Sequence, residues 1–289
     1  MDNARNKSLV SRRTFLRMAA AALALAGTGG LADAYAWNVE PNILVEEQVR
    51  VRLPRLPQIF DGLTIGFLSD FHVKGPSSPA HTARAAKILM AHKPDLVALG
   101  GDYITHSADD TMSCADALAQ LSAPLGVYGI LGNHDYWAGD TDKSVATLTD
   151  AGIRILRNES LPIGTASNGL FLIGLDDLWE KHTDLPRALS GVPDGACKIL
   201  LVHEPDFADQ AAQAEIALQL SGHSHGGQVR LPFIGAPILP YLATKYPIGL
   251  QRASPLTQVY TTRGVGLINP AVRFNCPPEV TILRLEAGT

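Results

Sequence analysis

The sequence predicts an α/β protein whose largely parallel or mixed sheet is covered by helices. Short buried strand-like runs alternate with helical stretches from residue 63 onward, and this alternation is typical of that class. The 289 residues are 46% hydrophobic and 18% charged, which suits a globular enzyme-sized domain and excludes disordered, collagen-like and disulfide-scaffold proteins. No repeat, low-complexity tract or long linker divides the chain.

Residues 1–36 predict an export signal. The segment SRRTFLR at 11–17 precedes a weakly apolar run, and Ala34-Tyr35-Ala36 has the small-x-small pattern of a signal-peptidase site. This arrangement resembles a twin-arginine signal. We therefore expect a signal peptide at 1–36, cleaved after Ala36, and one domain at 37–289. The expected partner is the twin-arginine export machinery, and the expected location is the periplasm or the outer face of the cytoplasmic membrane.

A basic helix start or a membrane anchor is the alternative for this segment, and retention of the signal as an anchor stays open. The apolar run is short for a membrane-spanning helix and is interrupted by glycines. Twin-arginine signals, as a class, export folded proteins, often with metals already bound. The resemblance therefore implies a metalloprotein.

Charge and cysteine content narrow the function classes. Residues 1–36 hold five of the 24 basic and two of the 28 acidic residues, so the remainder carries 19 against 26, a net charge of −7. Unspecific nucleic-acid binding depends on basic residues that displace counterions, so we expect no nucleic-acid partner. Cys114, Cys197 and Cys276 show no C-x-x-C spacing, which argues against zinc-ribbon and thioredoxin-like sites and favours buried thiols.

The elements follow in order. In the entry segment, residues 38–60, alternating Val49, Val51 and Leu53 predict an edge strand that prolines then end. A buried strand is expected at 63–68, and Ser78-Pro79 predicts the start of a helix that continues through Ala91. The same patterns predict helices near 110–121 and 141–151, and strands at 95–99, 127–131, 153–156, 170–173, 198–202, 216–220, 257–261 and 280–285.

Residues of the types that can bind metals follow five of these predicted strands. The clusters, in order, are Asp70-Phe71-His72, Gly101-Asp102, Gly132-Asn133-His134-Asp135, His203 and Gly222-His223-Ser224-His225. Open α/β sheets place their ligands at the carboxyl ends of strands. A lone histidine there is more often a structural residue, and Asn133 alone would be a turn residue. A G-N-H-D tetrapeptide, however, is expected by chance only on the order of a thousandth of a time at these residue frequencies. Five such clusters in order predict a metal site.

This ordered series resembles the calcineurin-like metallophosphoesterase family, over residues 70–225. The segments at 222–228 and 273–279 are similar to a bacterial subgroup of exported or membrane-associated phosphoesterases. The resemblance implies a four-layer αββα sandwich with a dinuclear metal site at the carboxyl ends of the strands.

Position by position, the resemblance implies two ligand sets. Asp70, His72, Asp102 and His225 would hold the first metal, and Asp102, Asn133, His203 and His223 the second. Two divalent cations about 3.5–4 Å apart require a bridging ligand, and a carboxylate such as Asp102 suits that position. Imidazole-rich sites favour Mn, Fe or Zn. His134 would stabilise the transition state or protonate the leaving oxygen, and Asp135 would orient His134.

We therefore expect hydrolysis of phosphomonoesters or phosphodiesters by attack of a metal-bridging hydroxide. One alternative is a hydrolase of pyrophosphate-linked or phospholipid-like envelope substrates. The other is a non-catalytic, metal-dependent scaffold. The presence of His134 argues against a scaffold, because a scaffold needs no proton donor beside the metals.

Two further features stay open. The residues that flank the clusters either shape the substrate pocket or serve packing and turns; they are Tyr103, His106, Tyr136, Trp137, Asp177 and His182. Residues 231–250 are apolar with almost no charge. They form either a lid for a lipid-like leaving group, with contact to a membrane surface, or an apolar crossover packed on the sandwich.

Overall fold

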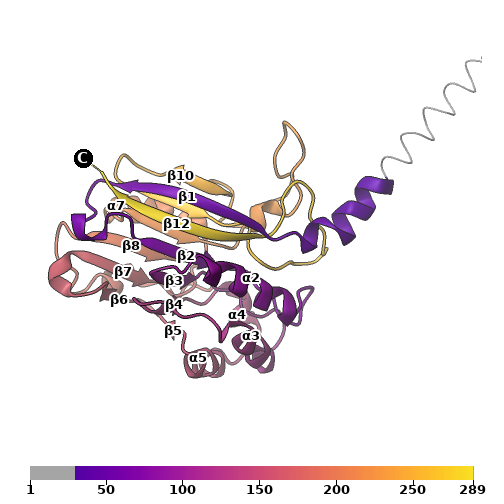
Figure 1. Ribbon diagram of the computed structural model, residues 1–289, viewed down its shortest axis with the longest axis horizontal. Helices are drawn as coiled ribbons and strands as arrows, with labels where there is room; N and C mark the ends of the chain where they lie inside the picture. The colour runs from indigo at the N-terminus through magenta and orange to yellow at the C-terminus, as the bar shows by residue number, and fades with distance from the viewer. Residues whose placement is uncertain (1–29, 289) are drawn as a thin grey trace, which may run out of the picture.

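Two six-stranded sheets form the centre of the molecule (Figure 1). The computed structural model describes residues 30–288. The first sheet has the order β1-β12-β2-β3-β4-β5. Its strands β2 to β5 are parallel, and β12 runs antiparallel to β2 and parallel to β1. The bounds are β1 (Val45–Leu53), β2 (Thr64–Leu68), β3 (Leu96–Leu99), β4 (Val127–Gly129), β5 (Arg154–Ile155) and β12 (Glu279–Ala287).

The second sheet has the order β10-β11-β9-β8-β7-β6. Its four inner strands are parallel, and the two edge strands β6 and β10 are antiparallel to their neighbours. The bounds are β6 (Glu159–Pro162), β7 (Leu170–Gly174), β8 (Cys197–Leu201), β9 (Leu218–Ser221), β10 (Gly249–Arg252) and β11 (Gln258–Thr261).

Helices cover the outer face of each sheet. The helices α2 (Pro79–Ala91), α3 (Thr111–Leu118) and α5 (Thr141–Asp150) pack on the first sheet. The short helices α6 (Leu185–Ala188) and α7 (Ala208–Gln213) pack on the second. The expected four-layer αββα sandwich is therefore confirmed.

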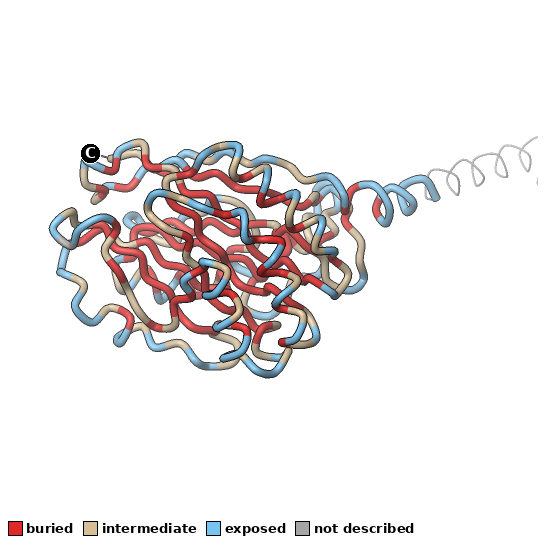
Figure 2. The backbone as a smooth tube through the Cα atoms, turned by 60° about the horizontal axis from the view of Figure 1, so that its bottom comes forward, coloured by how far each residue is buried: buried red, intermediate tan, exposed pale blue. Residues whose placement is uncertain are grey.

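Alternation along the strands builds the core between the sheets. Ile65 and Phe67 of β2 point inward to a cluster that also contains Ile199 of β8. Leu68 points outward and packs with Leu89 of α2. Side chains of a strand alternate between its two faces, so a run that is buried throughout requires cover on both sides. Figure 2 shows the buried strands in the middle of the molecule with exposed loops around them.

Most expected elements are present, with shifted ends. The edge strand, the helix that Ser78 caps and the later strands are confirmed, and Ser78 Oγ accepts a hydrogen bond from the N–H of His81. The strand expected at 127–131 ends earlier, at Gly129, and the helix expected near 110–121 is shorter. Sequence patterns missed β6 and β10 because both are short edge strands with polar residues. They also missed the short helices α4 (Asn133–Trp137), α6 and α7.

The described chain begins in a helix, residues 30–38, that projects from one end of the sandwich (Figure 1). Ala36 is buried, and its carbonyl accepts a hydrogen bond from the backbone N–H of Arg273 at 3.0 Å. The expected cleavage point after Ala36 falls within this helix. The twin-arginine segment lies outside the described residues, so the division at residue 36 stays a prediction. Among the described residues, no helix has the length and apolar character needed to cross a membrane.

Candidate metal centre

The turns that follow five strands bring the expected metal ligands together. Asp70 and His72 follow β2, Asp102 follows β3, and Asn133 begins α4 directly after β4. His203 follows β8, and His223 and His225 follow β9. All seven side chains are buried. Both sheets direct the carboxyl ends of these strands to one edge of the sandwich, so residues far apart in sequence form one cluster.

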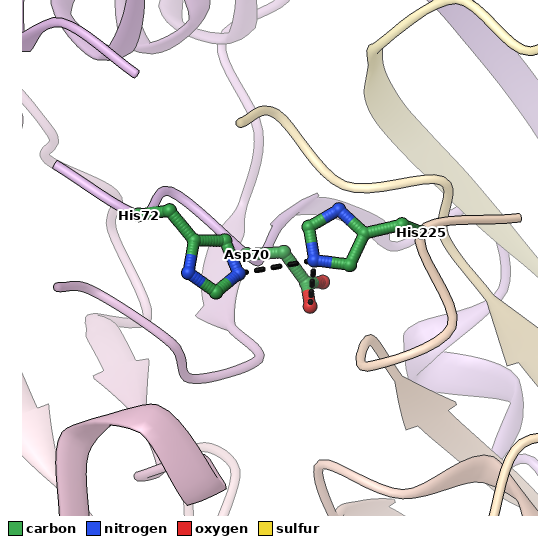
Figure 3. Close-up of side chains that lie close together, drawn as sticks. All are labelled: Asp70, His72 and His225. Carbon is green, nitrogen blue, oxygen red and sulfur yellow. Dashed lines mark hydrogen bonds and ion pairs between the residues drawn. The ribbon is translucent and has the colours of Figure 1, made fainter. Parts of the chain in front are cut away.

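The clustered side chains offer ligand atoms within metal-binding distance of one another. Three overlapping groups have their ligand atoms within 4.8 Å: Asp70 with His72 and His225, His72 with Asp102 and His134, and Asp70 with Asp102 and His203. Figure 3 shows the first group, in which His72 Nε2 lies 3.0 Å from His225 Nε2 and His225 Nε2 lies 3.5 Å from Asp70 Oδ1.

Asp102 lies between the two halves of the cluster. Its Oδ2 atom is 3.4 Å from His72 Nε2 and 3.2 Å from His203 Nε2. Its Oδ1 atom accepts a hydrogen bond from the backbone N–H of His134 at 2.9 Å. One carboxylate oxygen thus faces a histidine of each expected ligand set, which is the placement that a bridging ligand requires.

Hydrogen bonds fix the tautomers of two histidines. His203 Nδ1 lies 2.6 Å from the carbonyl of Gly100, and His223 Nε2 lies 2.8 Å from the carbonyl of Tyr241. A carbonyl only accepts, so each of these nitrogens carries the proton. In the neutral rings the lone pairs are on His203 Nε2 and His223 Nδ1, and these atoms can then bind a metal.

Unsatisfied buried atoms mark the same place. Asp70 Oδ2, Asn133 Oδ1 and His203 Nε2 are buried and have no hydrogen-bond partner among the described residues. Buried polar atoms in proteins are almost always paired, so a group of unpaired oxygen and nitrogen atoms indicates a missing ligand. The donor set, two carboxylates, one amide and four imidazoles, fits a pair of divalent ions.

Burial keeps His72 and His225 in the neutral form that binds metals, whereas it favours the protonated form of Asp70, and the carboxylate of Asp102 raises the pKa of His203. Burial lowers the pKa of His72 to about 3 and lowers that of His225 well below its usual value, which keeps both rings neutral. Burial raises the pKa of Asp70 to about 6. The unprotonated imidazoles retain the lone pair that a metal ligand needs.

The ligands lie on strained backbone. Asp70, His72, Asp102, His223 and His225 all adopt positive φ angles between 49° and 67°. Side chains other than glycine rarely adopt this region, and such strain concentrates at functional sites. A Cβ on Gly132 would collide with Asp102 Oδ1, which explains why glycine precedes Asn133.

Asp135 does not have the role expected for it. Its carboxylate accepts backbone hydrogen bonds at 2.9 Å from Asp102, Tyr103 and Gly132, and His134 Nδ1 has no partner among the described residues. Asp135 therefore fixes the turn that carries Asp102, and the expectation that it orients the ring of His134 is wrong. Short side chains at the start of a helix commonly bind nearby N–H groups in this way.

His134 lies at the rim of the cluster. Its ring is partly exposed and contacts the ring of His72 edge-on, with centroids 4.7 Å apart. The ring of Trp137 is tilted against it, with centroids also 4.7 Å apart. His134 is thus the histidine of the centre that bulk solvent and a substrate can reach most directly.

The flanking residues divide between packing and the site. Tyr103 is buried and stacks on Phe71, so its role is in packing the core. Tyr136 stacks on His182, and its hydroxyl donates to Asp176. His106 is exposed and makes no side-chain hydrogen bond among the described residues. Trp137 alone of the six residues that flank the clusters contacts His134 with its ring.

Two residues near His223 were missed by the sequence analysis. Buried Glu204 accepts hydrogen bonds from the backbone N–H groups of Leu178 and Trp179, at 3.2 and 3.1 Å. Trp179 then lies edge-on to His223 at 5.5 Å. Burial, with the negative charge of Glu204 beside it, raises the pKa of Asp177 to about 9, which favours its protonated carboxyl. Glu204 follows His203 directly, and that adjacency was its only signal.

Arg273 supports the other histidine turn. Its guanidinium group is fully buried and donates to the carbonyls of Arg263, Gly266 and Cys276 at 2.8, 2.6 and 3.0 Å. It also donates to the carbonyl of His225 at 3.4 Å. The tail segment at 273–279 thus acts by holding the loop that carries His225.

Comparisons with known proteins agree with this centre. The sequence model of the calcineurin-like phosphoesterase family matches residues 63–227. The chain is 33% identical to the uncharacterized metallophosphoesterase YkuE of Bacillus subtilis, over 96% of this chain and 98% of that one. It is 34% identical to the phosphodiesterase YaeI of Escherichia coli, over 96% of this chain and 100% of that one.

A third relative is longer. The transmembrane protein with metallophosphoesterase domain of Danio rerio is 31% identical, over 82% of this chain and 56% of that protein. The match of the family model covers all the expected ligands, from Asp70 to His225, and both bacterial relatives align along nearly their whole length. The chain belongs to the calcineurin-like phosphoesterase family.

Proposed function

We propose that the protein hydrolyses phosphate esters with two divalent metal ions bound at this centre. The observation that carries the proposal is the position of Asp102 Oδ2, within 3.4 Å of His72 Nε2 and within 3.2 Å of His203 Nε2. A catalytic site with one metal has no need of a carboxylate shared between two groups of histidines.

We assign the ligands to the two sets that the family resemblance implies. Asp70, His72, Asp102 and His225 would hold one ion, and Asp102, Asn133, His203 and His223 the other. When bound, such a pair of ions would polarise the phosphoryl oxygens and lower the pKa of bound water to near neutrality. The imidazole-rich donors favour Mn, Fe or Zn.

Charge then explains how an acidic protein binds phosphate. The two carboxylates, Asp70 and Asp102, only partly neutralise two dications. The metal-loaded centre would therefore carry a net positive charge that attracts an anionic substrate. The rest of the chain has an excess of acidic residues and does not provide this attraction.

His134 is the residue that moves a proton. Its backbone N–H donates to Asp102, and its ring is partly exposed and contacts the ring of Trp137. A histidine in this place can protonate the oxygen of the leaving group. Retention of this ring supports an enzyme over the non-catalytic scaffold.

A second candidate substrate class is a phosphodiester or pyrophosphate with an apolar leaving group. A cavity of about 270 Å³ adjoins His225, and its walls are mainly apolar: Ile238, Leu239, Pro240, Ile268, Pro270 and Val272. Such a cavity favours an alkyl or lipid-like group. The name of the Escherichia coli relative supports diesters over monoesters.

The proposed place of action is outside the cytoplasm. The paired arginines Arg12 and Arg13, the apolar run and the Ala34-Tyr35-Ala36 pattern support export by the twin-arginine machinery to the periplasm or the outer face of the cytoplasmic membrane.

The function is tested by a hydrolysis screen on metal-depleted protein. The protein is reloaded in turn with Mn, Fe, Zn or Mg and assayed with matched mono- and diester chromogenic substrates. We expect turnover only after reloading, with two ions per chain. In Asp102→Asn, we expect loss of activity and fewer than two bound ions, because the bridge is weakened. Normal turnover with full metal content in that variant would refute the assignment. Two bound ions without turnover of any ester would favour the scaffold.

A further inference from the structure

Exposed apolar side chains gather in two segments. Among the described residues, ten of the fifteen exposed large hydrophobic side chains lie in residues 31–43 and 231–241. They are Leu31, Tyr35, Trp37, Val39, Ile43, Leu231, Phe233, Ile234, Ile238 and Tyr241. We name these two segments together the apolar edge. Scattered exposed hydrophobic residues are ordinary, but a concentration of this kind marks an interaction surface.

The two segments adjoin each other. One shared hollow of about 470 Å³ is lined by Tyr35 and Ile43 of the first segment, by Pro232 of the second and by Phe274. Figure 1 shows the helix at 30–38 and the loop that contains residue 233 projecting from the same end of the sandwich. The apolar edge is therefore one surface.

The loop of this edge exposes large apolar side chains and carries no charged ones. Phe233 at its turn is fully exposed, and Ile234 and Ile238 are 72% and 78% exposed. Residues 231–244 contain no acidic or basic side chain, whereas Arg230 and Lys245 flank them. The part after this loop packs differently, since Ala243 and Tyr246 are buried. Residues 231–250 thus combine a projecting loop with a packed crossover.

We propose that the apolar edge docks on the surface of a lipid bilayer. Tyr35, Trp37 and Tyr241 are of the residue types that collect at the membrane–water interface. In the chain that keeps its first 36 residues as an anchor, five basic side chains and an apolar run precede residue 30, at this edge. Basic residues next to apolar ones favour anionic lipid over another protein surface. In the chain cleaved after Ala36, Trp37, Val39, Ile43 and the loop at 231–241 remain.

The docked orientation brings the bilayer to the metal centre. The carbonyl of Tyr241, at the end of the loop, accepts the hydrogen bond of His223 Nε2. Ile238 and Leu239 line the cavity that reaches His225. An ester whose leaving group stays in the membrane would then reach the centre along this loop, and this step alone rests on the proposed function.

Binding to vesicles tests the docking without any assay of turnover. The full chain is sedimented with vesicles of phosphatidylethanolamine and phosphatidylglycerol. Phe233→Ser/Ile234→Ser should weaken partitioning by about tenfold or more, because two large apolar side chains no longer leave water. The matched control is Ile59→Ser/Met112→Ser, which changes two residues that are 72% and 57% exposed outside the edge. Unchanged melting temperatures in both double variants show that folding is intact.

A second measurement reports how deeply the loop enters the bilayer. With brominated lipids, Phe233→Trp should add quenching to that of the native Trp37 of the apolar edge, and Ile59→Trp should not add quenching. Equal vesicle binding by the loop variant and wild type overturns the proposal. A concentration-dependent dimer without lipid, lost in the loop variant, overturns it in favour of a second copy of the chain. Asp102→Asn should bind vesicles normally even when inactive, so failure of the docking and failure of the proposed chemistry are distinguishable.

Discussion

At the scale of single residues, the metal centre holds acidic side chains where water cannot reach them. Burial raises the pKa of Asp70 from 3.8 to about 6, and the nearby charge of Asp102 adds to this shift. The folded pKa lies above the unfolded one, so the folded protein loses stability as the pH rises from 3.8 to 6. Above that pH the penalty is complete, on the order of 2–3 kcal/mol in the metal-free protein.

Asp70→Asn should therefore stabilise the metal-free protein while it weakens metal binding. Asn keeps the oxygen that accepts the N–H of His223 but carries no charge. We expect the variant to unfold at a higher denaturant concentration than wild type at pH 8 in the presence of a chelator, with the gap shrinking towards pH 4. Asp116→Asn, at an exposed position, is the control. A metal-free variant no more stable than wild type at pH 8 would contradict this account.

His134→Ala separates chemistry from metal binding. His134 is partly exposed at the rim and is outside both proposed ligand sets, so we expect both ions to remain while the rate falls roughly 10²- to 10⁴-fold. Esters with good leaving groups should lose less, because they need no proton at the leaving oxygen. Metal analysis that finds one ion missing would make His134 a ligand.

At the scale of elements, each strand positions the start of the turn that carries a metal ligand, and buried side chains from other segments hold the rest of that turn in place. Arg273 does this for the loop of His225, with four carbonyl acceptors around a guanidinium group that has no exposed surface. Removal of this group would leave several carbonyls unsatisfied, and each costs about 1–3 kcal/mol.

Arg273→Met should lower the melting temperature and weaken the affinity for the ion that His225 holds. Arg273→Lys keeps the charge but has fewer donors, so we expect an intermediate effect on both. Arg252→Met, at an exposed position, should change neither. The decisive measurement is metal titration at a temperature where all variants are folded. Lost stability with unchanged metal affinity would show that Arg273 supports the fold without positioning His225.

The same scale shows what sequence could predict. The strands and the ligands after them were predictable, because a buried run followed by Asp, His or Asn encodes both burial and chemistry locally. Glu204 and Trp179 were not, because their roles depend on a contact between two loops 25 residues apart. The partner of Asp135 also escaped prediction. Its neighbour His134 was the nearest candidate in sequence, whereas the backbone around Asp102 is nearest in space.

At the scale of the whole molecule, the first prediction concerns delivery. Changing Arg12 and Arg13 both to Lys should leave the protein in the cytoplasm and unprocessed, because the twin-arginine route depends on that pair and the general route tolerates lysine. Immunoblots of cell fractions measure this. A processed form that begins at Trp37 outside the cytoplasm, in the variant as in wild type, would indicate the general route.

The topology of the first sheet also limits when the protein can fold. Within residues 30–288, the first strand, β1, pairs only with the last strand, β12, over nine residues from Val45 with Glu279 to Leu53 with Ala287. β12 also separates β1 from β2, the strand that leads into Asp70 and His72. The sheet that carries four of the seven proposed metal ligands is therefore incomplete until residues 279–287 have been synthesised. A truncation before Glu279 would remove β12 and with it the strand that joins β1 to β2, so we expect it to prevent the sheet under Asp70 and His72 from forming.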